Sequence, residues 1–231
     1  GRDDHVLGER LGARVDALEQ LIIQHKPKLV YLIPSFGNPS GAMLTLERRK
    51  KILQLAVEHK VLVVEDDPYG ELYFGAPPPP SIMALSKDVE GSRNYLVYCG
   101  SFSKVLSPGI RVGWMIAPAE LLAKATMCKQ FSDAHTSNLS QAIAANYLGL
   151  KDGQQSRLEK TLAVVRSTYA ERAHTMAACL QKQLGHALTY TQPQGGMFFW
   201  TRLTGQPMPG SAASTSQDAT AYAKRAPDHG V

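Results

Sequence analysis

Four short segments of the sequence carry side chains whose types and order could support chemistry on an amine and an anion. They are PSFGNPSG at 34–41, EDDPYGEL at 65–72, GSFSKVLSPGIR at 100–111 and PQGGMFFW at 193–200. The first three offer an amide, a carboxylate with a phenol, and an amine with hydroxyls and a guanidinium. A lysine amine can condense with a carbonyl group, and a guanidinium can bind an anion through two hydrogen bonds. The residues therefore predict a site that forms a Schiff base and binds an anion.

The first three segments each follow a predicted strand. Apolar runs rich in β-branched residues predict strands at 29–33, 61–64, 95–99 and 112–117. A helix predicted over 45–59, with Thr45 as its N-cap, separates the first two strands, and this order favours a buried parallel pair. The link between the last two strands is barely long enough for a crossover helix, so we expect the fourth strand to be antiparallel, at or near an edge. Ligands of open α/β sheets bind beyond the carboxyl ends of the strands, which brings the three segments together.

Other patterns extend this α/β interpretation along the chain. Helical spacing predicts helices at 15–25, 119–131, 137–148, 154–184 and 217–228. Residues 188–203 predict a strand, a Gly-Gly turn and a second strand, and the proline run at 77–80 predicts a stiff surface loop. The fold class is thus a mostly parallel sheet flanked by helices, with a partial α+β domain at the C-terminus.

Composition excludes several classes of protein. The chain has 231 residues, of which 44% are hydrophobic and 19% charged, as in ordinary globular proteins. Three widely spaced cysteines predict a reducing, cytoplasmic location rather than a disulfide framework. The net charge of +5 comes from scattered basic residues, and the cluster at 48–51 is expected on a solvated helix face, so we predict neither nucleic-acid nor membrane binding. The seven histidines form no ligand-spaced pair, which argues against a metal site. Both ends of the chain break the α/β pattern, which predicts a fragment lacking both ends.

Taken in this order, the four segments resemble the class I and II aminotransferases of pyridoxal-phosphate fold type I. EDDPYGEL is most similar to the branch that contains 2-aminoadipate, kynurenine and other aromatic or branched-chain aminotransferases. The resemblance covers nearly the whole chain. It implies a pyridoxal 5'-phosphate cofactor, amino-acid and 2-oxo-acid substrates, and a homodimer. It also implies a large cofactor-binding domain over 1–165 and a small domain over 166–231, bridged by the helix at 154–184.

The resemblance assigns roles to particular residues. Lys104 matches the lysine that holds the cofactor as a Schiff base and then moves the substrate proton. Asp66 matches the carboxylate that pairs with the pyridine nitrogen, and Tyr69 the phenol that donates to the cofactor O3′. Asn38 matches an amide that also contacts O3′. The Asp-x-x-Tyr spacing selects Asp66 over its neighbour Asp67, which is expected to be structural.

Ser101, Ser103 and Arg111 match part of the family's phosphate cradle, with Arg111 binding the anion through two donors. The same resemblance places the Gly195-Gly196 segment near the substrate, although both glycines are expected to serve the turn itself. The two tryptophans are expected in the core. The family's glycine phosphate loop, its stacking aromatic and its substrate-carboxylate arginine are not identifiable in the sequence.

Three functions remain open on the residues alone. The first is transfer of an amino group between an L-amino acid and a 2-oxo acid such as 2-oxoglutarate. The second is another reaction on the same cofactor, such as β-elimination, which the same residues would serve equally. The third is regulatory: the chain would then be the aminotransferase-like effector domain of a winged-helix transcription factor. A winged helix would distinguish it, and the sequence contains none.

Overall fold

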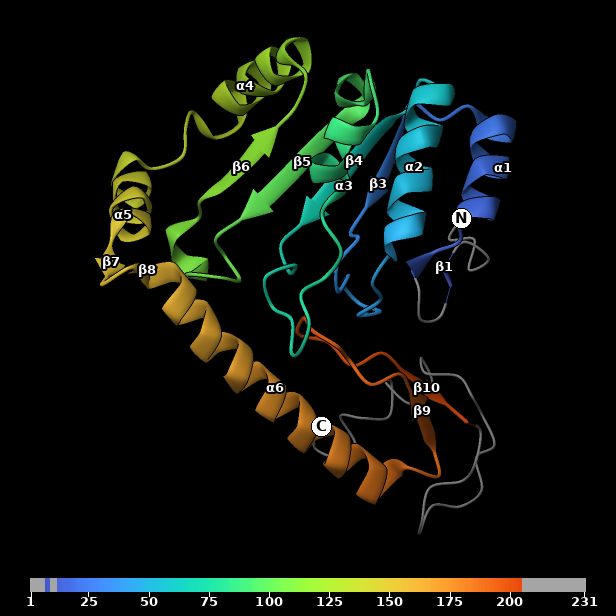
Figure 1. The fold of residues 1–231 in the computed structure, drawn as a ribbon, viewed down its shortest axis with the longest axis vertical. Helices are drawn as coiled ribbons and strands as arrows, with labels where there is room; N and C mark the ends of the chain where they lie inside the picture. The colour runs from blue at the N-terminus through green and yellow to red at the C-terminus, as the bar shows by residue number, and fades with distance from the viewer. Residues whose placement is uncertain (1–6, 9–11, 205–231) are drawn as a thin grey trace.

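The computed structural model of this chain describes residues 7–8 and 12–204. At its centre lies a four-stranded sheet in the order β3-β4-β5-β6 (Figure 1). Strands β3 (Leu29–Leu32), β4 (Leu62–Asp67) and β5 (Leu96–Ser101) are parallel, whereas β6 (Gly113–Ile116) pairs antiparallel with β5. The predicted α/β fold, the parallel first pair and the antiparallel edge strand are all confirmed.

Helices flank this sheet and continue the alternation. The helices are α1 (Val15–His25), α2 (Leu46–Glu58), α3 (Ile82–Leu85), α4 (Ala119–Asp133), α5 (Asn138–Gly149) and α6 (Arg157–Leu184). Short 3-10 helices occur at Ser86–Asp88, Ser92–Tyr95 and Pro108–Ile110. Small antiparallel pairs join β1 (Leu7–Gly8) to β2 (Gly12–Ala13), β7 (Lys151–Asp152) to β8 (Gln155–Ser156), and β9 (Leu188–Tyr190) to β10 (Thr201–Leu203). One hydrophobic core joins α1, α2 and α3 to β4 and β5.

Two helices begin at side-chain caps that the sequence carries. The Thr45 hydroxyl accepts a hydrogen bond from the Arg48 amide at 3.4 Å, which confirms the predicted N-cap of α2. Ser156 and Glu159 form a reciprocal capping box at the start of α6. The helix predicted from residue 154 therefore starts at residue 157, because the preceding two residues pair with β7 instead.

Strand β4 includes three successive acidic residues, Glu65, Asp66 and Asp67. The sequence predicts instead that the strand ends at residue 64 and that these residues follow it. Alternation along the strand turns Glu65 and Asp67 to one face of the sheet and Asp66 to the other. Glu65 is buried, and its two carboxylate oxygens accept the amides of Ile82 and Met83, each at 2.8 Å. The first turn of α3 thus supplies hydrogen bonds to a buried carboxyl group. Because the predicted strand contains only apolar residues, the sequence pattern did not place Glu65 in it.

The basic cluster at 48–51 is not wholly solvated, contrary to the prediction, because Arg49 is only 1% exposed. Its guanidinium donates to the carbonyls of Leu44 and Pro34, each at 3.0 Å, to the carbonyl of Pro80 at 3.3 Å and to the Ser35 hydroxyl at 2.9 Å. Burial lowers the pKa of Arg49, while the charges of Glu65 and Asp67 oppose this shift. A single arginine therefore links α2 to the segment after β3 and to the proline loop.

The C-terminal part departs from the simple hairpin predicted over 188–203. Only three residues pair on each side, in β9 and β10, and the residues between them leave the pair to reach the main sheet domain. Figure 1 shows α6 extending from the β7–β8 pair to the β9–β10 pair. The helix predicted at 217–228 lies outside the described residues, and the division into two domains near residue 165 stays a prediction.

The side of the molecule around β6, α4 and α5 is unusually exposed. No residue of α4 is buried, and Phe131 is 84% exposed. Trp114 and Trp200 are 41% and 59% exposed, so the expectation that both lie in the core is wrong. None of the helices in the described ranges is long and apolar enough to cross a membrane.

The Arg49 contacts predict a large effect from a single substitution. Arg49→Met leaves three carbonyls and a hydroxyl in a buried region without their donor and removes the positive charge near Glu65 and Asp67. We expect the free energy of unfolding, measured by urea denaturation, to fall by about 3 kcal/mol or more. Lys50→Met, at the exposed next position of the same helix, is the control and should change it by less than about 0.5 kcal/mol. Equal effects of the two substitutions would contradict this account of Arg49.

The burial of Glu65 should make the free energy of unfolding depend on pH. Burial raises the pKa of Glu65, although its two amide hydrogen bonds oppose the shift. The folded chain therefore retains a proton that the unfolded chain releases, and stability falls as pH rises from about 4.3, the ordinary glutamate pKa, through the raised value. Across this window Glu65→Gln should become progressively more stable relative to the unmodified chain in urea titrations. A difference that does not vary with pH would contradict this, and Glu120→Gln on exposed α4 serves as the control.

Candidate functional site

The predicted site residues lie at the carboxyl edge of the sheet because neighbouring parallel strands end together. Asp66 on β4 is aligned with Cys99 on β5, and Asp67 with Gly100. Ser101 is the last residue of β5, so the lysine-bearing segment starts beside the carboxylates of β4. The pairing thus brings the second and third sequence segments to one place.

Asp66 is half-buried and accepts a hydrogen bond from the hydroxyl of Tyr31, a residue of β3 that the sequence reasoning missed. Partial burial and this bond raise the pKa of Tyr31 to about 12, so the phenol stays protonated and able to donate. The residues are far apart in the chain and meet only through strand pairing. The alternation of β3 was the one signal that could have placed Tyr31 on this face.

Asp67 has a structural role beneath the site. Its carboxylate accepts the Gly70 amide at 2.9 Å and the Tyr98 hydroxyl at 3.3 Å, and burial raises its pKa. A cavity of about 360 Å³ borders it, lined also by Arg49 and the proline loop 77–80. Asp67 thereby shapes the turn that carries Tyr69.

Tyr69 is only 6% exposed and belongs to a second hydrophobic cluster. The buried members of this cluster are Phe36, Tyr69, Leu72, Val105 and Leu162. They come from the segments after β3, β4 and β5 and from α6, and the ring of Phe198 meets Tyr69 edge-on at 5.6 Å. The cluster therefore anchors all four sequence segments around one phenol.

The three residues predicted to bind an anion, Ser101, Ser103 and Arg111, are linked to one another by hydrogen bonds. The Arg111 guanidinium donates to the Ser103 hydroxyl at 3.2 Å, and the Ser103 amide donates to the Ser101 hydroxyl at 3.1 Å. Arg111 adopts a left-handed backbone conformation, with φ of 52°. Within the described part of the chain no carboxylate pairs with Arg111, so its charge is available to an anion.

Lys104 and Asn38 are exposed. Lys104 lies one residue before the buried Val105, which fixes the backbone of its turn against the second cluster. Asn38 lies two residues after the buried Phe36 and is joined to Pro39 by a cis peptide bond. Among the described residues, no side-chain hydrogen bond joins either residue to Asp66 or Tyr69, so their part in a common site stays a prediction.

The segment between β9 and β10 packs directly against the loops after β3 and β4. The Gly196 amide donates to the Leu72 carbonyl at 2.8 Å, and the Phe74 amide to the Gln194 carbonyl at 2.9 Å. A Cβ on Gly195 would lie 2.6 Å from the Phe36 ring and 2.7 Å from the Leu72 carbonyl, and Gly196 has a positive φ of 76°. The glycines permit close approach as well as a turn, which sequence spacing did not show.

The fold and the residues at its carboxyl edge define fold type I, a fold class of pyridoxal-phosphate-dependent proteins. The chain belongs to the aminotransferase class I and II family, whose sequence model matches residues 8–225. It is 43% identical over 192 residues to a 2-aminoadipate transaminase of Thermus thermophilus, covering 83% of this chain and 46% of that protein. The chain spans about half the length of the curated relatives it matches.

Two further similarities bear on function. The crystal structure of LysN, an alpha-aminoadipate aminotransferase of Thermus thermophilus complexed with N-(5'-phosphopyridoxyl)-L-leucine, is 41% identical with a TM-score of 0.77. That likeness covers 85% of this chain and 48% of the other. The uncharacterized HTH-type transcriptional regulator YisV of Bacillus subtilis is 36% identical over 177 residues, or 77% of this chain and 34% of that protein.

The close approach at Gly195 predicts a steric effect. Gly195→Ala forces the Phe36 ring or the Leu72 carbonyl to shift, which should lower the free energy of unfolding by about 1–3 kcal/mol. Gly75→Ala is the matched control, because a Cβ there meets nothing within 4 Å. Urea denaturation of the two variants provides the test. A Gly195→Ala variant as stable as the Gly75→Ala variant would show that the segment does not pack as described.

Proposed function

We propose that this chain contributes the lysine, the pyridine-nitrogen partner and part of the phosphate cradle of an aminotransferase that uses pyridoxal 5'-phosphate. The observation that carries the proposal is the second hydrophobic cluster, which gathers four separate segments around Tyr69 at the carboxyl edge of the sheet. Family membership and the likeness to a structure bound to a phosphopyridoxyl compound support it.

The chemistry of the donor set fits this cofactor. Arg111, Ser103 and Ser101 supply a cation and hydroxyls suited to a phosphate, and the half-buried carboxylate of Asp66 suits a protonated ring nitrogen. When bound, pyridoxal phosphate supplies an aldehyde carbon for an amine and a pyridinium ring that withdraws electrons. No contact in the described structure opposes this assignment.

Each of the remaining residues then has one task. The Lys104 amine would accept the proton from the substrate Cα and deliver it to the cofactor carbon C4′, and the second half-reaction would run this transfer in reverse. The Asp66 carboxylate holds a proton on the ring nitrogen, and Tyr31 orients that carboxylate by its hydrogen bond. Tyr69 and Asn38 hold the ring oxygen O3′ by hydrogen bonds.

The substrates follow from the relatives rather than from the described geometry. Names such as 2-aminoadipate transaminase and aromatic-amino-acid aminotransferase support an L-amino acid of 2-aminoadipate, aromatic or branched-chain type, with a 2-oxo acid such as 2-oxoglutarate as acceptor. A homodimer would cover part of the exposed side at β6 and α4. The bridging role of α6 between a large and a small domain belongs to the same proposal.

A second candidate is the effector domain of a transcriptional regulator, which the similarity to YisV favours. Such a domain would keep the same lysine and cofactor contacts without turnover. The two functions separate on one measurement, the release of a 2-oxo acid after an L-amino acid is added to the cofactor-loaded full-length protein. β-Elimination would also release a 2-oxo acid, but its nitrogen would leave as ammonia and no new amino acid would form from an acceptor 2-oxo acid.

The direct test is covalent labelling of the lysine. The chain is incubated with pyridoxal phosphate, reduced with borohydride, digested and analysed by mass spectrometry. We expect a phosphopyridoxyl group on Lys104 Nζ, lost in Lys104→Ala and kept in Lys124→Ala, whose lysine lies on exposed α4. Label spread evenly over surface lysines, or equal labelling of the two variants, would contradict the proposal.

A further inference from the structure

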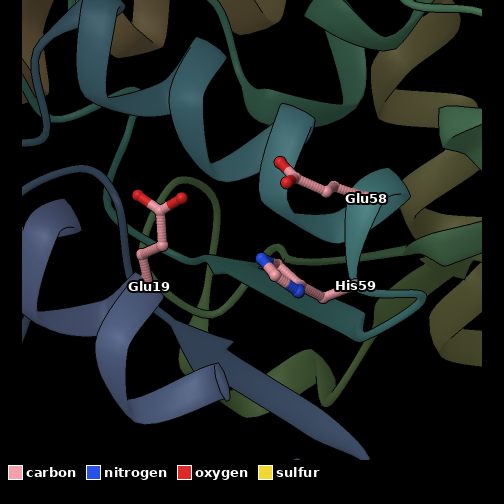
Figure 2. Close-up of side chains that lie close together, drawn as sticks. All are labelled: Glu19, Glu58 and His59. Atoms are coloured by element: carbon pink, nitrogen blue, oxygen red, sulfur yellow. The ribbon is translucent and has the colours of Figure 1, made fainter.

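A second group of polar side chains lies away from the proposed cofactor site, between α1 and the carboxyl end of α2. Glu19 belongs to α1, Glu58 is the last residue of α2 and His59 is its C-cap. One ligand atom from each lies within 4.8 Å of the other two. Figure 2 shows the three side chains directed into the same space between the helices.

The imidazole of His59 leaves a buried polar atom without a partner. Its Nε2 atom is shielded from solvent and makes no hydrogen bond within the described part of the chain. A buried nitrogen without a partner is unfavourable, so a ligand bound to Nε2 would remove this unfavourable term. Figure 2 shows the ring turned toward the space between the two carboxylates, which makes it a suitable third ligand.

The charges of the group are only partly balanced. Lys51 Nζ lies 3.2 Å from the Glu19 carboxylate, and this is the one cation paired with either glutamate among the described residues. Glu58 is exposed and makes no ion pair in that part of the chain. A dication would relieve the repulsion between the two carboxylates, in competition with the Lys51 ammonium.

The ligand types select the kind of ion. Magnesium and calcium prefer oxygen ligands alone, whereas zinc and its transition-metal neighbours bind imidazole together with carboxylates. Zinc is bound at about 2.0–2.2 Å by these atoms, so the exposed Glu58 side chain must rotate inward to close the set. Three protein ligands leave a fourth position for water or a further ligand.

We propose that Glu19, Glu58 and His59 form a binding site for a zinc-type transition-metal dication that links α1 to α2. The site is independent of the aminotransferase proposal, because it shares no residue with the carboxyl edge of the sheet. It departs from our prediction of no metal site, which considered only histidine pairs. The three ligands come from two helices, and spacing along the chain does not reveal them.

Zinc titration of the metal-free protein tests the site. After dialysis against a chelator, isothermal titration calorimetry at neutral pH should show zinc binding, and zinc should raise the midpoint of thermal unfolding. Magnesium should produce neither effect. His59→Gln should weaken the zinc affinity by more than about 10-fold, the loss typical of removing even an outer partner of a metal ligand. His135→Gln, an exposed histidine in the α4–α5 connection, is the matched control.

A third variant distinguishes this site from random surface binding. Lys51→Gln removes the ammonium that competes for Glu19, so it should tighten zinc binding. Unchanged zinc affinity in His59→Gln, or equal losses in His59→Gln and His135→Gln, would overturn the proposal. If His59→Gln does not fold, the visible spectrum of the unmodified protein with Co²⁺ decides instead. A spectrum identical to that of the hydrated ion would overturn the site.

Discussion

The candidate site depends first on the pairing of β4 with a parallel strand on each side. Because β3 and β5 satisfy its backbone, β4 can continue through Glu65, Asp66 and Asp67 without apolar side chains. Alternation then gives the three carboxylates two separate environments. Asp66, which we propose pairs with the cofactor, faces Tyr31, whereas its two neighbours face a region closed by Arg49 and the first turn of α3.

The buried arginine balances this second region. Arg49 is the one guanidinium in the described chain that lies almost wholly inside the protein, and its donors reach three carbonyls and a hydroxyl. Glu65 directs its hydrogen bonds to the start of α3 rather than to the arginine. The two groups thus hold different loops in place, and they interact mainly through charge. This arrangement holds in place the loops that lie beneath the candidate site.

The upper part of the site is assembled by packing. Phe36, in the loop after β3, packs against the Gly195-Gly196 segment, and the absence of side chains on the glycines lets the two backbones approach. The same cluster holds Tyr69 and the residue after Lys104. Residues from four parts of the chain are therefore positioned by a few apolar contacts. From the exposed side, β6 adds Trp114, whose ring lies 4.7 Å from that of Phe102, a residue packed against the same cluster.

The sequence by itself determined the order of the main strands and helices, the parallel first pair, the antiparallel edge strand, the Thr45 cap and the four segments that identify the family. These are local signals: periodicity, capping residues and short motifs act over a few neighbouring positions. Only the tertiary structure decided that Arg49 is buried, that Tyr31 donates to Asp66, that Gly195 packs on Phe36, and that Glu19 meets His59. Each of these contacts joins residues that are distant in the chain and adjacent only after the strands and helices pack. Their partners leave no spacing pattern, because burial and hydrogen bonding depend on what the whole fold brings beside them.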